Sequence, residues 1–493
     1  MSLLSPSAAA TRARTELRLP VWWPVAALTV LAAALRLFHL GRESLWFDEV
    51  YSIWVAQGPM WSLPTLLAWK VPFPLYYSLL HGWLLVFGPG PVALRLFSVS
   101  AGVASVPLLW RFTARRLGAA AAFWAAALLA VSPLHIWYSQ EGRQYALVVL
   151  LVILAADALQ HALLEDRRRD WAVYALWATA ALYTHYYAGF VLAGFGLVAL
   201  WSWWHKGHHR AGFVRLVLAH LTVGVLFAPE LIVPLGQAQS GTWNWVAAKY
   251  GVPGLRQLYD LAAALTYGTL FDPSPLLKLA VLGLYSLAAL VGISALRRGE
   301  ERPVLLLVVA WLGTAPLLAF LISQIAPLFL TRYLLPVLPA YLVLVAAGVG
   351  RLKPPYARRL GGALLLAMSL VAALPIYAGG LKEDWRGVAQ VVATQEQPGD
   401  LIVLVDEDIA IPFDYYYTGR ADQLRISRGV TDPAKIGAMV APALAGHGRL
   451  WLVASHAPGE QVKHWLLAAP GLVLVSHQPF QGLELMLFQV GPG

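Results

Sequence analysis

The chain has 493 residues, of which 59% are hydrophobic and only 13% are charged. A soluble domain of ordinary composition carries about 25% charged residues, so this composition excludes an ordinary soluble globule. The absence of cysteine excludes disulfides, thiolate zinc sites and cysteine nucleophiles. The net charge of +10 comes from short basic clusters between apolar blocks. That pattern sets membrane topology and argues against a nucleic-acid partner.

Repeated apolar blocks of roughly 18–22 residues predict about eleven transmembrane helices. Residues 1–20 lack the short apolar core and cleavage site of a signal peptide, and we expect a cytoplasmic tail there. The fold class is therefore a polytopic α-helical membrane protein, with a membrane domain over residues 21–379. The expected helices cover residues 21–38, 92–110, 117–136, 144–163, 171–184, 187–204, 212–233, 276–296, 303–323, 334–350 and 360–378.

The arginine clusters orient these helices. With the N-terminus inside, the clusters Arg111–Arg116 and Arg167–Arg169 also fall inside, as the positive-inside rule requires. Counting residues 73–87 as a span would place both clusters outside. We therefore expect two long outer loops, over residues 39–91 and 234–275, whose apolar parts lie along the membrane interface.

The composition changes after Tyr377. Short apolar runs at residues 401–405, 449–454, 472–475 and 483–488 alternate with helical or turn-rich stretches. This pattern predicts a small α/β domain over residues 380–493, which the expected topology places on the outer side.

Polar residues at the outer ends of the spans are candidates for chemistry, since each is costly at the membrane unless it is paired or functional. Asp48 and Glu49 follow the first span and are able to hold a general base; the alternative is a pair of solvated acids that cap an interfacial helix. Glu141 and Arg143 share a very short outer turn. They form either a local ion pair or a second acid beside a phosphate-binding arginine.

Three further segments lie on the same side. His185 in Thr184–Tyr187 is a lone histidine, for which packing is the commoner role, and no metal-ligand spacing accompanies it. Arg332 has no acid nearby in the sequence, and either snorkels to headgroups or binds an anionic lipid phosphate. The charged stretch Lys382–Arg386 either borders a site or is an exposed charged linker, and we interpret it as the linker.

The order of these motifs resembles that of the GT-C glycosyltransferases, in particular bacterial members of glycosyltransferase family 39. These are relatives of the protein O-mannosyltransferases and of the lipid A aminoarabinose transferases. The resemblance covers about residues 20–390. It rests on Asp48-Glu49, Pro74–Tyr77 with His81 and Trp83, Ala93–Leu96, Ser139–Tyr145, Thr184–Tyr187 and Arg332–Pro336.

The resemblance implies a polyprenyl-phosphate-linked sugar as donor and transfer with inversion at the outer face of the bacterial cytoplasmic membrane. Asp48 would be the general base, Glu49 would position it, and Glu141 would assist at the acceptor or at a metal. A divalent metal is left open, and no metal ligand is assigned. Expected contacts to the donor phosphate are Arg143, Arg332, Tyr145, Tyr333 and Lys70; further site candidates are His185, Tyr187 and His81.

Two other classes of function compete with this interpretation. A transporter or lipid flippase would place charges or broken helices at mid-bilayer, often in repeated halves, whereas this chain keeps its acids in outer loops. An inactive relative that retains only binding is the third hypothesis, and the intact Asp48-Glu49 pair argues against it.

Overall fold

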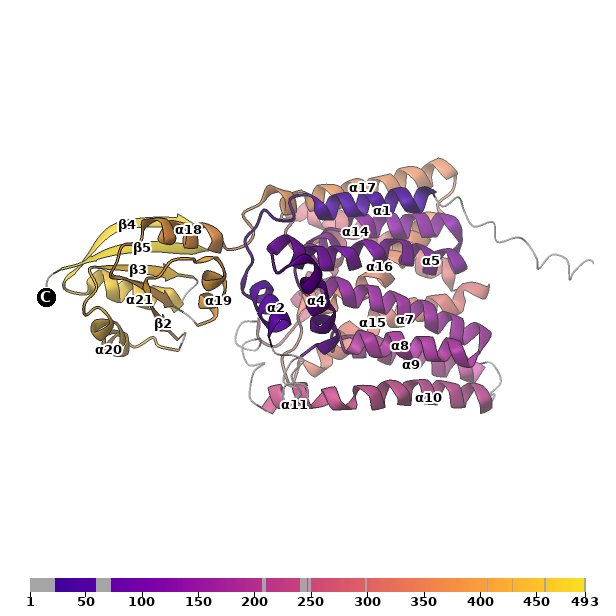
Figure 1. Cartoon of the computed structure of the whole chain (residues 1–493). Helices are drawn as coiled ribbons and strands as arrows, with labels where there is room; N and C mark the ends of the chain where they lie inside the picture. The colour runs from indigo at the N-terminus through magenta and orange to yellow at the C-terminus, as the bar shows by residue number, and fades with distance from the viewer. Residues whose placement is uncertain are drawn as a thin grey trace, which may run out of the picture.

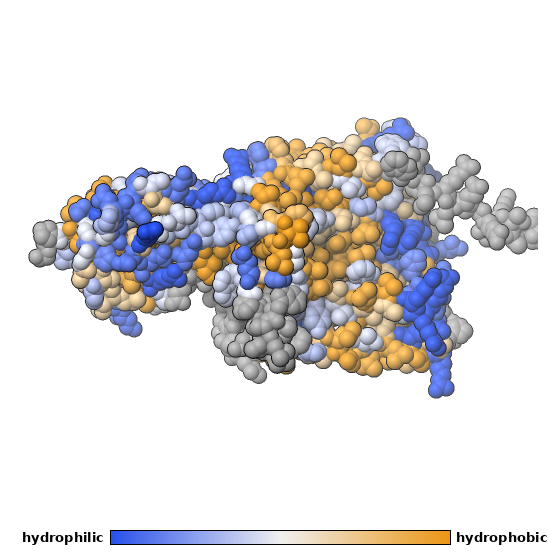
Figure 2. Space-filling view, viewed as in Figure 1, coloured by the Kyte–Doolittle hydropathy of each residue, from blue (hydrophilic) through white to orange (hydrophobic). Residues whose placement is uncertain are grey.

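The computed structural model describes residues 23–58, 72–205, 210–239, 246, 250–297, 299–405, 407–427, 429–455 and 458–491. Two bodies follow one another along the chain: a large helical bundle and a small domain built on a sheet (Figure 1). Their surfaces differ on the face shown in Figure 2, where apolar side chains cover much of the bundle and the small domain is largely hydrophilic. The expected N-terminal tail, residues 1–20, lies outside the described residues.

Long apolar helices form the bundle. Eight helices of the described residues are long and apolar enough to cross a membrane, and α1 is a shorter apolar helix. The helical elements of the bundle are α1 (Trp23–Leu37), α2 (Phe47–Gln57), α4 (Pro74–Phe87), α5 (Pro91–Val131), α6 (Pro133–Ser139), α7 (Tyr145–Glu165), α8 (Arg168–Leu182), α9 (Ala188–His205), α10 (Arg210–Phe227), η2 (Ala228–Leu231), α11 (Ile232–Gln239), α13 (Leu255–Tyr267), α14 (Pro275–Leu296), η3 (Gly299–Glu301), α15 (Arg302–Ile322), η4 (Thr331–Val337), α16 (Leu338–Arg351) and α17 (Pro355–Ala378).

The longest helix, α5, is two segments that reverse direction at Gly118. This glycine has φ of 78° and ψ of 175°, a conformation that breaks a helix and favours glycine. Both segments reach the side chain of Arg36. A Cβ on Gly102, in the first segment, would lie 3.3 Å from Arg36 Nε, and the Arg36 guanidinium donates to the carbonyls of Leu129 and Ala130 in the second. Helices occupy all eleven predicted segments when α5 is counted as two and the shorter α1 and α8 are included.

Helix α16 lies at the centre of the bundle, and most of its residues are buried. It packs on α14 through two glycines, where a Cβ on Gly292 would lie 2.1 Å from the Leu344 oxygen and one on Gly348 would lie 1.9 Å from the Ala288 oxygen. Only glycine permits this approach of two backbones, which is how membrane helices gain packing contact.

The short helices α2 and α4 lie at the end of the bundle that faces the small domain (Figure 1). At 11 and 14 residues they are too short to cross a bilayer. They occupy the predicted first outer loop, so the expectation of short interfacial helices in place of a span is consistent with the structure. We call this end of the bundle the docked end.

The small domain is a three-layer α/β/α sandwich, which confirms the predicted α/β class. Strand order is β2-β1-β3-β5-β4, with β1 parallel to β2 and β3, and β5 antiparallel to β3 and β4. Along β1, Ile402 and Leu404 pack with α18 and α19, while Leu401, Val403 and Val405 pack with α20 and α21. The elements are α18 (Trp385–Gln395), β1 (Asp400–Val405), α19 (Glu407–Tyr416), β2 (Asp422–Ile426), α20 (Pro433–Ala443), β3 (Arg449–Ala454), α21 (Pro458–Ala468), β4 (Leu472–Phe480) and β5 (Leu483–Val490).

Candidate active site

Asp48 and Glu49 form the first turn of α2 at the docked end. Negative charge is favourable at a helix N-terminus, where backbone N–H groups are free. Consecutive helical residues point about 100° apart, so the two carboxylates enter different surroundings. Glu49 is fully buried, and Asp48 is only partly buried.

Glu49 is held by two cations and a backbone amide. Arg95 donates to both of its oxygens at 2.8 Å, Lys382 Nζ lies 2.8 Å from Oε2, and Gly142 N donates to Oε1 at 2.9 Å. Burial alone would raise the pKa of Glu49, but Arg95 and Lys382 outweigh it and lower that pKa to about 2. A carboxylate so fully paired is a poor proton acceptor, and its role is to fix the position of its neighbours.

Arg95 belongs to α5, and a charge inside an apolar helix is costly unless it is paired. Its guanidinium also donates to the carbonyls of Leu40, Glu43 and Ser44, at 2.8–2.9 Å. Arg95 therefore ties the turn after α1 and the start of α2 to the bundle.

Lys382 reaches this cluster from the segment before the small domain. Its side chain is buried against Glu49, and its Nζ lies 5.6 Å from the centroid of the Trp137 ring. The interpretation of Lys382–Arg386 as an exposed linker is wrong for Lys382, because the fold closes this segment over Glu49. Around it, Ser44 donates to Asp384, and the Tyr416 hydroxyl accepts from Leu45 N.

Glu141 is the unpaired acid of the site. It is buried, its Oε1 has no hydrogen-bond partner, and its side chain makes no ion pair with any described residue. Burial is the main cause that raises the pKa of Glu141 to about 7; Lys382 and Arg332 oppose the rise, and Glu49 and Asp48 add to it. The local ion pair with Arg143, one of the two alternatives for this turn, is not formed.

Arg143 turns toward α2 and α4. Its Nη1 donates to the Asp48 carbonyl at 3.3 Å, to Ser52 Oγ at 3.2 Å and to the Tyr77 hydroxyl at 3.3 Å. Its buried Nε has no partner among the described residues. The guanidinium is thus fixed beside Asp48, and its Nε–H is left for a ligand.

His185 is buried and neutral. Burial, together with the charges of Arg143 and Arg332, lowers the pKa of His185 to about 3. Its Nδ1 accepts from Tyr187 N at 3.2 Å, so the proton sits on Nε2. That Nε2 is buried and finds no acceptor among the described residues. His185 therefore offers a neutral N–H donor, while Phe73 stacks on its ring at 5.3 Å.

Arg332 and two tyrosines complete the group. Arg332 lies on η4 with its guanidinium 5.4 Å from the Tyr333 ring centroid. The rings of Tyr145 and Tyr333 stack at 6.3 Å, and Tyr333 also meets His185 edge-on at 4.9 Å. The charge of Arg332 acts on both Glu141 and His185. We name the group of Asp48, Glu49, Arg95, Glu141, Arg143, His185, Arg332 and Lys382 the polar cluster.

The remaining candidates lie at its border or outside it. Tyr187 donates to the Leu328 carbonyl, and its ring packs 5.1 Å from that of Tyr333. His81 Nδ1 lies 2.6 Å from the Ala56 carbonyl, so His81 joins α4 to α2. Lys70 lies outside the described residues. Within the described part of the chain, no three His, Asp or Glu side chains gather closely enough to hold a metal ion.

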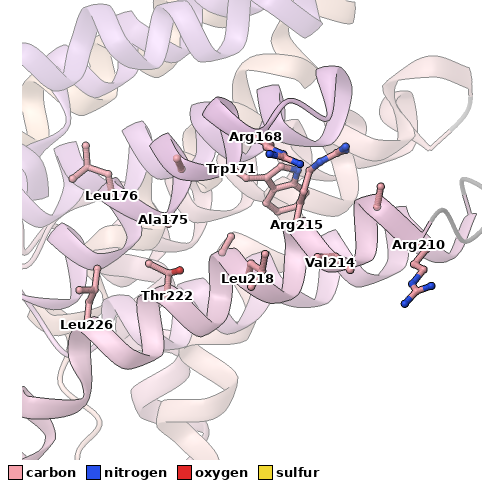
Figure 3. A pocket seen from close by; sticks show the side chains of 13 residues that line it. Arg168, Trp171, Ala175, Leu176, Arg210, Val214, Arg215, Leu218, Thr222 and Leu226 are labelled. Carbon is pink, nitrogen blue, oxygen red and sulfur yellow. The ribbon is translucent and has the colours of Figure 1, made fainter.

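A large groove lies elsewhere on the bundle. A hollow of about 990 Å³ runs between α8 and α10, with Arg168 and Arg215 toward one end and Leu176 and Leu226 toward the other (Figure 3). Its lining is mostly apolar, and it opens on the side of the bundle. It is suited to lipid, and it contains none of the acids of the polar cluster.

A comparison of sequences finds one family. A family model described as dolichyl-phosphate-mannose-protein mannosyltransferase matches residues 70–232, a segment that includes Glu141, Arg143 and His185. No curated protein sequence matches the chain.

Solved structures match over most of the chain. ArnT from Cupriavidus metallidurans bound to undecaprenyl phosphate is 15% identical with a TM-score of 0.58, covering 95% of this chain and 98% of that one. The Archaeoglobus fulgidus oligosaccharyltransferase in complex with Zn and sulfate is 12% identical with a TM-score of 0.54, covering 87% and 67%. The arabinofuranosyltransferase AftD from Mycobacteria is 16% identical with a TM-score of 0.51, covering 96% and 40%.

These findings define the class: the chain is a multi-pass membrane protein with the fold of the GT-C glycosyltransferases. The resemblance to that class, inferred from the sequence motifs, is confirmed by the family match and by the fold. Among these structures, the similarity to ArnT extends over nearly the whole length of both chains.

Proposed function

We propose that this protein transfers a sugar from a polyprenyl-phosphate-linked donor to a hydroxyl acceptor, with inversion, at the extracytoplasmic face of a bacterial cytoplasmic membrane. The observation that carries the proposal is a partly exposed carboxylate, Asp48, set among buried cations that exceed the acids in number.

The charge of the polar cluster supports an anionic ligand. Its four cations are Arg95, Arg143, Arg332 and Lys382, and its three acids are Asp48, Glu49 and Glu141. With a pKa of about 7, Glu141 is partly protonated near neutral pH. The cluster therefore carries a net charge between about +1 and +2. A lipid phosphate has the charge to balance it.

Asp48 is the proposed general base. Glu49 is committed to Arg95 and Lys382, whereas the Asp48 carboxylate is partly exposed at the start of α2. In the proposed step, the acceptor oxygen forms a bond to the anomeric carbon and gives its proton to Asp48. The bond from that carbon to the phosphate oxygen breaks, and the polyprenyl phosphate leaves with the electron pair. Attack opposite the leaving group inverts the anomeric centre.

Three donors are proposed to stabilise the leaving phosphate. Arg143 and Arg332 supply guanidinium groups, which match phosphate oxygens in shape and charge. His185 adds its unshared Nε2–H, a donor that brings no positive charge because the ring is neutral. Such donors gain strength where water is excluded. Tyr145 and Tyr333 would form the wall beside them, and Lys70 is a further proposed contact to the phosphate.

The proposed orientation follows from the two ends of the bundle. The polar cluster and the small domain share the docked end, while the arginine clusters of residues 111–116 and 167–169 belong to the other end. We therefore propose residues 1–20 as a cytoplasmic tail, residues 21–379 as the membrane domain and residues 380–493 as an extracytoplasmic domain.

The test is a transfer assay with purified protein in liposomes that contain a membrane lipid extract. Mass spectrometry follows the consumption of polyprenyl-phosphate sugars and the rise of free polyprenyl phosphate. We expect consumption by the wild type and a loss of about 10²–10⁴-fold in Asp48→Asn, with unchanged folding by size-exclusion chromatography. Full activity of Asp48→Asn would remove Asp48 from the mechanism.

A further inference from the structure

A cavity with a mostly apolar lining and a few polar side chains lies far from the polar cluster, at the other end of the bundle. It has a volume of about 260 Å³, and α5, α7, α9, η3 and α15 contribute to its wall. Gln160 on α7 lines it, separated from Tyr145 by about 22 Å of helix rise. The proposed sugar transfer makes no use of this cavity.

Gln160 is the residue that points to a ligand. Its side chain is only 6% exposed, yet its buried Nε2 has no hydrogen-bond partner among the described residues. Buried polar atoms are nearly always satisfied by protein or by a bound molecule. An unpaired N–H donor on a side chain that lines a cavity calls for an acceptor oxygen.

Arg116 supplies a positive charge to the same wall. The neighbouring Arg111 and Arg115 both pair with Asp157, but Arg116 forms neither an ion pair nor a hydrogen bond with any described residue. Ser202 adds a hydroxyl from α9. These three side chains provide one guanidinium, one amide donor and one hydroxyl, a set that suits phosphate oxygens.

Two other residues of the lining offer hydrogen-bond acceptors. Glu300 on η3 places a carboxylate in the lining. His205 Nδ1 lies 3.0 Å from the Trp201 carbonyl, which requires a proton on Nδ1 and leaves Nε2 as an acceptor in the neutral ring. A carboxylate and an imidazole nitrogen suit an ammonium group.

We infer that this cavity binds the headgroup of a zwitterionic phospholipid, with the phosphate at Arg116 and Gln160 and the ammonium at Glu300. Apolar side chains, including Leu163, Val304 and Leu307, line the rest of the cavity. The volume suits a headgroup and not two acyl chains. The chains therefore leave past Leu164, which is 50% exposed on the side of the bundle.

Native mass spectrometry of the full-length protein in detergent tests the inference. The probes are phosphatidylethanolamine and phosphatidylglycerol with identical acyl chains, added at equal concentration. We expect one phosphatidylethanolamine to be retained with a preference of about tenfold over phosphatidylglycerol, equal to about 1.4 kcal/mol. Equal retention of the two lipids would overturn the inference.

Variants test the contacts to the phosphate and to the ammonium separately. Arg116→Gln and Gln160→Met should each lower phosphatidylethanolamine retention about tenfold, and Gln160→Met removes an unpaired polar atom, so the fold is retained. Glu300→Gln should abolish the preference for phosphatidylethanolamine. The control is Arg359→Gln, an exposed arginine on α17 at the same end, which should match the wild type. Wild-type retention in Arg116→Gln or Gln160→Met would contradict the proposed site.

Discussion

Lys382 Nζ lies 2.8 Å from Oε2 of Glu49, and both side chains are buried. The contact joins the first helix after α1 to the segment that precedes the small domain. Glu49 is in turn bound to Arg95 and to the backbone N–H of Gly142, next to Glu141. The position of the small domain and the geometry of the polar cluster are therefore linked through one carboxylate.

Glu49→Gln should destabilise the protein. The substitution keeps the shape of the side chain but leaves Arg95 and Lys382 buried without a counter-charge. Breaking a buried ion pair typically costs about 3–5 kcal/mol. We expect a lower thermal midpoint and lower yield in detergent, measured by differential scanning fluorimetry. Asp48→Asn, at the neighbouring and partly exposed position, is the matched control and should melt like the wild type. Equal midpoints for all three proteins would contradict a structural role for Glu49.

Donor affinity should fall as pH rises through about 7. Glu141 is neutral below its raised pKa and negative above it, so the cluster is more positive at low pH. A polyprenyl-phosphate sugar is a phosphodiester whose single charge stays constant across this range. Binding should therefore be tighter at pH 6 than at pH 8, as measured by titration of purified protein.

Glu141→Gln isolates the residue responsible, because its amide is neutral at every pH. We expect this variant to bind the donor equally well at pH 6 and pH 8. A variant that keeps the pH dependence of the wild type would assign the titration to another group.

Lys382→Met should move this titration to higher pH. Of the charges that lower the pKa of Glu141, Lys382 has the largest effect, ahead of Arg332. Its removal therefore lets the pKa of Glu141 rise further, and donor affinity should decline at a pH above about 7. Lys382→Arg retains the charge and should restore the wild-type profile. A profile that stays in place in Lys382→Met would show that Lys382 does not act on Glu141.

Arg332→Ala should weaken donor binding. A hydrogen bond to a charged group is worth about 1.5–3 kcal/mol, which corresponds to roughly a 10- to 100-fold loss of affinity. Arg256→Ala is the control, since Arg256 is an exposed arginine whose side chain is 87% exposed and pairs only loosely with Asp260. Unchanged affinity in Arg332→Ala would reduce Arg332 to an anchor at the membrane surface.

Much of the fold was predictable because the length of an apolar run distinguishes a membrane-spanning helix from a short buried strand. The split of α5 at Gly118 agrees with the two predicted spans, and four of the five strands match the apolar runs of the last domain. Strand β2 was missed because Asp422 and Arg425 make it polar, and it lies at the sheet edge with most of its residues partly exposed.

The pairing within the polar cluster was less predictable. The sequence indicated that Asp48, Glu141, Arg143 and Arg332 share one end of the bundle. It did not indicate that Lys382 and Arg95 meet at Glu49, because periodicity says which face a residue occupies and not which distant residue it meets. The isolated charge of Arg95 inside an apolar helix was the available signal, since such a charge requires a partner.

The most direct test of the account measures the lipids that co-purify with Asp48→Asn. This variant is expected to bind the donor and to be unable to use it, so mass spectrometry of its lipid extract should show a polyprenyl-phosphate sugar at a higher level than in the wild type. The double variant Asp48→Asn with Arg332→Ala should lose that lipid. If Asp48→Asn carries no polyprenyl-phosphate sugar and still supports wild-type sugar transfer, then the polar cluster is not the site of a glycosyl transfer reaction.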